Sequence, residues 1–186
     1  MKSTSNLNAI FITGISASGK TTLAKKLVKE LRNAYLSVLL LDGTEMYKDS
    51  ILYPFDGHTL KHRKERASHH IRLVKWISNQ NILPIIAFIG QPLSIRDLWK
   101  SHLDDWKEIY LKCDVETCIA RDNKDLYKNK KKNTSIIGVD SEFEEPKDTW
   151  LEIDTSKYEK DKVLDIACNK IKSIEWLNFY KINNEA

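Results

Sequence analysis

The sequence has little cysteine, which argues against two kinds of small protein. Its three cysteines, Cys113, Cys118 and Cys168, form no Cys-x-x-Cys pair. An odd number of cysteines without that spacing fits neither a disulfide framework nor a zinc site. We therefore expect buried thiols in a reducing compartment.

Long apolar runs are also absent. The longest apolar stretch, 82–90, is much shorter than the roughly 20 residues of a membrane-spanning helix, so we expect no membrane contact. The first apolar run ends in a glycine motif and not in the small-residue cleavage site of a signal peptide. These two features together predict a cytoplasmic protein.

A strong excess of charge of one sign is missing too. Lysine and arginine number 30 and aspartate and glutamate 26, which gives a net charge of +4. The basic run 128–132 contains no aromatic residue, so it indicates a solvated segment and not a nucleic-acid site. Four histidines lie between residues 58 and 70, but no H-E-x-x-H motif accompanies them, so we expect no metal site there.

Apolar runs alternate with amphipathic stretches along the 186 residues, which predicts one α/β domain spanning 1–186. Strands are expected at 9–13, 38–41, 84–89, 108–111 and 151–154. Helices are expected at 20–32, 60–80, 97–104 and 116–121, with a C-terminal helix at approximately 160–178. The strands are almost continuously apolar, which indicates a mostly parallel five-stranded sheet with helices on both faces. Ligands of such a three-layer sandwich bind at the carboxyl ends of the strands.

Two segments do not fit this alternation. The stretch at approximately 123–149 is rich in lysine, asparagine and acidic residues and shows little periodicity, so we interpret it as a mobile lid. The tail 174–180 is apolar for the end of a chain. It is compatible both with covering the core and with a homodimer contact, and both alternatives stay open.

A glycine-rich motif lies between the first predicted strand and the first predicted helix. Residues 14–21, GISASGKT, match the P-loop pattern G-x-x-x-x-G-K-[ST] at every fixed position. A chance match is expected in about one chain in a hundred or fewer, and the rival patterns G-x-G-x-x-G and G-x-S-x-G do not fit. We therefore predict a P-loop NTPase-type fold. The predicted phosphate-binding residues for ATP are Gly14, Ile15, Ser16, Ala17, Ser18, Gly19, Lys20, Thr21 and Thr22.

The chemistry of a P-loop gives individual residues their expected roles. Loop N–H groups and the helix N-terminus attract phosphate; Lys20 is expected to reach the β- and γ-phosphates, and the Thr21 hydroxyl to bind Mg²⁺. Asp42 ends the second predicted strand, where its carboxylate either orients Mg²⁺ or accepts the proton of an attacking hydroxyl. The alternative is a turn formed by Asp42 and Gly43. Lys20 and Asp42 are the candidate catalytic residues.

Further motifs resemble those of the adenylylsulfate (APS) kinase family. After the P-loop come LDG at 41–43, CIARDNKDLYK at 118–128 and IGVDSEFEEP at 137–146, the last similar to the family's F-T-G-I-D-x-x-Y-E-x-P. The similarity covers about residues 9–155. It implies a kinase that uses ATP and Mg²⁺ to phosphorylate the 3′-hydroxyl of APS, a small anionic nucleotide.

The resemblance also implies which residues bind the two substrates. On the ATP side it adds Arg121 and Lys124, with ion pairs to neighbouring aspartates as the alternative. On the acceptor side the expected residues are His58, Arg63, Arg66, Arg96, Ile137 and Gly138.

The acceptor motifs depart from the family pattern at several positions. Thr44 and Tyr47 replace its second aspartate and an arginine, and Arg66 replaces an asparagine. The resemblance makes APS the leading acceptor, and the departures support the alternative of another nucleotide acceptor, such as cytidine diphosphoramidate. A nucleotide-binding regulatory module without an acceptor is the alternative of another class.

Overall fold

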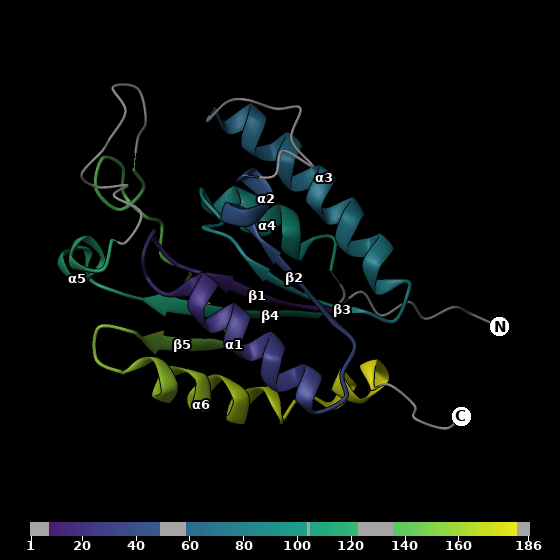
Figure 1. The fold of residues 1–186 in the computed structure, drawn as a ribbon. Coiled ribbons are helices and arrows are strands. Elements are labelled where there is room, and N and C mark those ends of the chain that lie inside the picture. The colour runs from purple at the N-terminus through teal and green to yellow at the C-terminus, as the bar shows by residue number, and fades with distance from the viewer. Residues whose placement is uncertain (1–7, 49–58, 104, 123–135, 182–186) are drawn as a thin grey trace.

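The computed structural model describes residues 8–48, 59–103, 105–122 and 136–181, which form one parallel sheet covered by helices (Figure 1). The strands are β1 Asn8–Thr13, β2 Val38–Asp42, β3 Leu83–Ala87, β4 Asp105–Lys112 and β5 Leu151–Asp154. Their order in the sheet is β2-β3-β1-β4-β5, and every neighbouring pair is parallel. The predicted five-stranded parallel sheet is confirmed.

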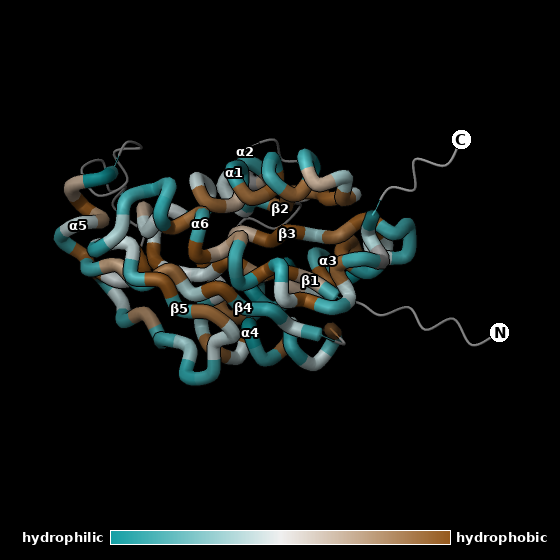
Figure 2. The backbone as a smooth tube through the Cα atoms, turned by 90° about the horizontal axis from the view of Figure 1, so that it is seen from below, coloured by the Kyte–Doolittle hydropathy of each residue, from teal (hydrophilic) through white to brown (hydrophobic). Residues whose placement is uncertain are grey.

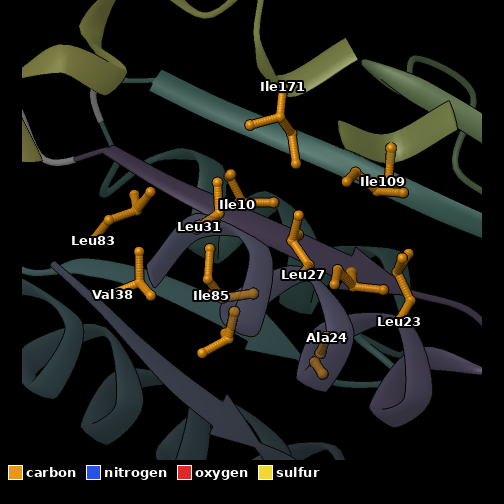
Figure 3. Close-up of a cluster of buried hydrophobic side chains, with 14 of the residues drawn as sticks. Ile10, Leu23, Ala24, Leu27, Leu31, Val38, Leu83, Ile85, Ile109 and Ile171 are labelled. Atoms are coloured by element: carbon orange, nitrogen blue, oxygen red, sulfur yellow. The ribbon is translucent and has the colours of Figure 1, made fainter. Parts of the chain in front are cut away.

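Each face of the sheet carries its own hydrophobic core. Helices α1 Lys20–Asn33 and α6 Lys160–Ile171 cover one face, and α3 Leu60–Ser78 and α4 Leu93–Lys100 cover the other. Figure 3 shows the first core, in which Leu27 of α1 gathers with Ile10 and Ile85 of the sheet. Full burial of one such leucine contributes roughly 1.5–3 kcal/mol.

Strand β1 shows why the strands are apolar on both sides. Ile10 and Ile12 belong to the core under α1 and α6, whereas Phe11 belongs to the core under α3 and α4. Successive side chains of a strand point to opposite faces, so a central strand needs apolar residues at every position. Figure 2 shows the same hydrophobic character along the neighbouring inner strand β3. Among the described helices, none is both long and apolar enough to cross a membrane.

Two predicted boundaries on the α4–β4 side were wrong, because distant partners set them. The helix predicted at 97–104 is α4, which begins at Leu93, where the carboxylate of Glu144 accepts a hydrogen bond of 2.6 Å from the Leu93 N–H. Strand β4 begins at Asp105 and not at 108, because its first residues pair with β1, Asp105 opposite Asn8. Neither partner is near in sequence.

The structure contains two further elements that periodicity did not show. Helix α2, Gly43–Lys48, follows β2 directly, because Asp42 Oδ1 accepts hydrogen bonds from the N–H groups of Thr44 (2.8 Å) and Glu45 (3.2 Å). At the C-terminal end, α6 stops at Ile171, and the short 3₁₀ helix η1, Glu175–Tyr180, follows. The predicted continuous helix 160–178 was therefore wrong.

The apolar tail covers the core. Ile174 and Tyr180 are 6% and 5% exposed and belong to the cluster under α1 and α6. The Trp176 indole N–H donates to the Asp105 carboxylate at the start of β4, which ties η1 to the sheet. Residues 123–135 of the predicted lid lie outside the described residues. The described part, 136–149, has no helix and one isolated bridge, between Ile137 and Ser141.

The turn from β1 into α1 requires glycine at its first position. Gly14 has φ +147°, and a Cβ there would lie 2.6 Å from the Leu111 carbonyl oxygen of β4 and 2.7 Å from Ser18 Oγ. Gly19 also has a positive φ, +100°, but a Cβ there would meet no atom within 4 Å. The two glycines therefore differ in packing and share the unusual backbone conformation.

Helix α3 buries a histidine against the sheet. His70 is 5% exposed, and its ring lies 4.8 Å from that of Phe88. Burial, with smaller contributions from Arg66 and His69, lowers the pKa of His70 from 6.5 to about 4. The imidazole is therefore neutral in the folded protein near neutral pH, because charging it would cost its solvation.

We predict that Gly14→Ala destabilises the fold more than Gly19→Ala. Both substitutions force alanine into a positive φ, but only the first adds a clash with a backbone carbonyl, which costs an additional ~1–3 kcal/mol. Urea denaturation of the two variants and the native protein measures the difference. Equal losses would show that the Leu111 carbonyl gives way.

We predict that stability falls as the pH falls and that His70 causes part of this fall. The pKa of His70 is lower in the folded than in the unfolded state, so the unfolded chain takes up the proton first, and stability is lost from about pH 6.5 towards pH 4. The loss between about pH 7 and about pH 5 is about 2 kcal/mol. His70→Gln should remove this part of the pH dependence in urea titrations, whereas His69→Gln, at the exposed neighbouring position, should keep it.

Candidate active site

The candidate site lies at the carboxyl end of the sheet, where the register aligns three strand ends. Asp42, the last residue of β2, is opposite Ala87 of β3, which is opposite Ile12 of β1. The Thr13 hydroxyl donates to the Ile89 carbonyl at 2.7 Å and fixes the chain beyond β3 to β1. The parallel sheet thus places the end of β2 beside the loop that follows β1, as the sequence predicted.

The glycine-rich loop bends around the N-terminus of α1. Gly14, Ala17 and Gly19 all have positive φ. The first helical hydrogen bond runs from the Leu23 N–H to the Gly19 carbonyl, and no side chain caps α1. Lys20 Nζ donates to the Ile15 carbonyl at 2.6 Å, so the ammonium group lies over the same loop. A helix N-terminus and a lysine on one loop attract a phosphate group.

Two oxygen-bearing side chains meet beside this loop. The Thr21 hydroxyl donates to Asp42 Oδ2 at 2.6 Å, although the two residues belong to α1 and β2. Asp42 is 2% exposed, and its other oxygen is held by the start of α2. A hydroxyl and a carboxylate oxygen are oxygen ligands of the kind that Mg²⁺ prefers. The pair therefore fits the predicted magnesium site.

Two arginines of α3 lie close together on the predicted acceptor side. Burial and, second, the positive charge of Arg66 lower the pKa of Arg63. Arg63 Nη1 also donates to the Gln91 carbonyl at 3.2 Å, beyond the end of β3. Two neighbouring guanidinium groups at the ligand end of a sheet favour an anion.

Arg96 lies deeper than the sequence suggested. It is 1% exposed, its Nη2 donates to the Glu144 carbonyl, and its Nε lies 3.8 Å from Glu108 Oε1. Burial lowers the pKa of Arg96, against the opposing charges of Glu108 and Glu144. In this structure Arg96 is buried and engaged with Glu144 and Glu108, and a direct contact with the acceptor stays a prediction.

The described end of the predicted lid contacts the glycine-rich loop. Ile137 is buried, and a Cβ on Gly138 would lie 3.0 Å from Ile15 Cγ2. Gly138 has φ +94°, and its N–H donates to the Ser141 carbonyl at 2.7 Å. The two predicted acceptor residues of this segment are thus beside the loop that is expected to hold ATP.

Arg121 is linked to the glycine-rich loop through Thr155. Its Nη2 donates to the Thr155 carbonyl at 2.9 Å, and the Thr155 hydroxyl donates to the Ser18 carbonyl at 3.1 Å. This chain of bonds joins Arg121 to the loop, which fits a contact with bound ATP. His58 and Lys124 lie outside the described residues.

Sequence reasoning missed three residues that organise the site: Gln91, Glu144 and Thr155. Thr155 follows the end of β5, so its position at the ligand end of the sheet was a usable signal. Glu144 lies inside the 137–146 motif, but the motif did not predict a role for it. No sequence pattern pointed to Gln91. Its contact with Glu144 spans 53 positions.

Comparisons with known proteins agree with this geometry. The family model described as adenylylsulphate kinase matches residues 7–154. The probable adenylyl-sulfate kinase of Pyrococcus abyssi is 30% identical over 170 residues, which cover 90% of this chain and 97% of that protein. The cytidine diphosphoramidate kinase of Campylobacter jejuni is 32% identical over 139 residues, which cover 74% of this chain and 80% of that protein.

A solved structure shares the fold. The APS kinase CysC of Mycobacterium tuberculosis, in complex with AMPPNP and APS, aligns with a TM-score of 0.79 at 21% identity, covering 89% of this chain and 98% of that one. The family match covers most of the chain, and the fold and the glycine-rich loop are those expected of such a kinase. This chain therefore belongs to the adenylylsulphate kinase family.

Proposed function

We propose that the protein transfers the γ-phosphoryl group of ATP to a hydroxyl group of a small anionic nucleotide. The observation that carries this proposal is the 2.6 Å hydrogen bond between Thr21 and Asp42 beside the glycine-rich loop. It brings a potential magnesium ligand pair next to Lys20, whose ammonium group already lies on that loop. A triphosphate on the loop would meet both at once.

Each residue would act on charge or on position. The loop amides, the α1 N-terminus and Lys20 would stabilise the negative charge of the transferring group. Thr21 and Asp42 would hold Mg²⁺, which would neutralise part of the negative charge of the phosphates. Asp42 would also orient the acceptor hydroxyl or take its proton. Arg121, anchored on Thr155, would hold the nucleotide.

APS is the first acceptor to test. The family and its relative from Pyrococcus abyssi are described by this activity. An acceptor of this kind carries an anionic group, which suits the paired guanidinium groups of Arg63 and Arg66 on α3. Arg63 and Arg66, with His58 and the backbone of Ile137 and Gly138, form the proposed acceptor side.

A second acceptor class has specific support. The Campylobacter jejuni relative, 32% identical, is a cytidine diphosphoramidate kinase. The acceptor motifs of this chain depart from the family pattern at Thr44 and Arg66, whereas the glycine-rich loop keeps it. Losing hydrogen-bond partners on the acceptor side changes the preference for the acceptor more than it changes the use of ATP.

We also propose that the enzyme is cytoplasmic and has no nucleic-acid partner. A homodimer is an additional proposal.

We predict that purified protein with Mg²⁺ and ATP releases ADP in the presence of APS or a cytidine nucleotide such as cytidine diphosphoramidate, and that mass spectrometry finds one added phosphate on the acceptor. Lys20→Ala should lower turnover by a factor of about 100–1,000, because it removes a charge that stabilises the transferring group. Lys29→Ala, on the exposed side of the same helix, is the matched control and should keep native rates. A protein that binds ATP but modifies no acceptor in the screen would be the regulatory module instead.

We predict that Asp42→Asn retains the fold but loses activity. The amide keeps an acceptor oxygen for the start of α2 and a polar contact with Thr21, yet it removes the negative charge that would attract Mg²⁺. Turnover should fall at least ~100-fold, and the Mg²⁺ concentration for half-maximal rate should rise. Kinetics over a series of Mg²⁺ concentrations test this, and an unchanged magnesium dependence would remove Asp42 from the metal site.

A further inference from the structure

The backbone of Glu144 is held by the side chain of a distant residue. Gln91 Nε2 donates to the Glu144 carbonyl at 2.8 Å, and the Glu144 N–H donates to Gln91 Oε1 at 3.3 Å. An amide side chain that pairs with both backbone groups of one residue imitates a strand partner. This pairing fixes one point of the irregular segment 136–149.

The side chain of Glu144 makes a separate contact. Its Oε2 accepts from the Leu93 N–H at 2.6 Å, at the start of α4. The N-cap residue of α4 is Pro92, whose side chain makes no capping hydrogen bond. Glu144 therefore supplies the cap from 51 positions away, and its negative charge suits the N-terminus of a helix.

Arg96 and Tyr110 of β4 contact Phe143, the residue before Glu144. The Arg96 guanidinium lies 5.5 Å from the ring centre of Phe143, and it donates to the Glu144 carbonyl. Phe143 stacks on Tyr110 of β4, with ring centres 5.8 Å apart and an interplanar angle of 15°. We call the contacts of Gln91, Leu93 and Arg96 with Phe143 and Glu144 the Glu144 clasp.

The buried carboxylate of Glu108 lies beside Arg96 of the clasp. Glu108 of β4 is 0% exposed and lies 3.8 Å from Arg96 Nε. Burial raises the pKa of Glu108, while the Trp106 indole hydrogen bond and Arg96 oppose this shift. Without such a partner the Arg96 charge would be buried and uncompensated, which is costly.

The clasp connects the two sides of the proposed active site. On one side, the Gln91 carbonyl accepts from Arg63 Nη1 at 3.2 Å, and Arg63 is a proposed acceptor residue. On the other side, the segment that holds Glu144 also contains Gly138, which lies against Ile15 of the glycine-rich loop. Loosening Glu144 would therefore loosen Gln91, whose carbonyl accepts from Arg63, and the segment that carries the Gly138 backbone.

We propose that Gln91, Arg96 and Glu144 are positioning residues that act through the clasp to hold Arg63 and Gly138 in place for the acceptor. This inference rests on the proposed kinase function. The ATP side has its own anchors, the Thr21–Asp42 bond and the Lys20 contact with the loop. Disrupting the clasp should thus weaken binding of the acceptor more than binding of ATP.

The test compares variants of the clasp in the full-length protein, with the acceptor that the screen above identifies. Gln91→Ala and Glu144→Ala should raise the KM for the acceptor about tenfold, because a loosened site must be ordered on binding. kcat and the KM for ATP should stay within about twofold. Glu144→Gln should restore the native KM, because its amide oxygen still accepts from the Leu93 N–H. Gln80→Ala, an exposed glutamine at the end of α3, is the matched control.

Hydrogen exchange separates failure of the clasp from failure of the kinase proposal. In Gln91→Ala and Glu144→Ala the Gly138 amide, bonded to Ser141, should lose protection by a factor of about ten, while core amides of β1 keep theirs. This readout needs no acceptor. Unchanged Gly138 exchange, an unchanged acceptor KM, or an equal rise in both KM values would each overturn the clasp. A wild-type protein that phosphorylates no acceptor would overturn the proposed function, and the exchange result would still decide whether the clasp holds the segment.

Discussion

The hydrogen bond between Thr21 and Asp42 joins the two elements on which the site depends, the first turn of α1 and the end of β2. It exists because β3 lies between β2 and β1, with Asp42, Ala87 and Ile12 in register. A slip of one residue in either pairing would turn Asp42 to the other face of the sheet. The parallel sheet is therefore part of the site as well as its support. The two cores that hold its faces fix the distance between the hydroxyl and the carboxylate.

The charged groups of the candidate site also depend on the order of the strands. The α1 N-terminus, Lys20, Arg63 and Arg66 bring positive charge to one end of the sheet. Asp42 is the carboxylate among the proposed site residues, and it is already engaged with Thr21 and α2. Such a site favours a polyanion, and magnesium would balance part of the charge of the phosphates. This explains why a chain with a net charge of only +4 suits an anionic nucleotide.

The segment 136–149 combines local hydrogen bonds with contacts to distant residues. It has no helix or strand of its own, and the N–H groups of Gly138, Val139 and Asp140 donate to carbonyls within the segment. The backbone groups of Glu144 pair with the side chains of Gln91 and Arg96, and its carboxylate accepts from the Leu93 N–H; all three partners follow β3. Glu144 in turn caps α4. The contacts are reciprocal: the segment sets the start of a helix, and that part of the fold holds the segment.

The sequence alone determined the features that arise from local patterns. The strand–loop–helix of the P-loop, the apolar strands and the amphipathic α1 follow from residue types at short spacing, since a strand buried on both faces and a helix with one apolar face each leave a local signature. The pattern also predicted the place of Asp42 at the carboxyl end of the sheet, because Asp42 ends a strand.

Only the tertiary structure decided where α4 and β4 begin, that Asp42 meets Thr21, and that Arg96 is buried beside Glu108. In each case the decisive partner is far away in sequence: Glu144 for Leu93, Asn8 for Asp105, Thr21 for Asp42 and Glu108 for Arg96. The identity of the side chain shows that an arginine can pair with an anion. Whether that anion is a substrate or a buried glutamate depends on which surfaces the fold brings together, and no local pattern of residues contains that information.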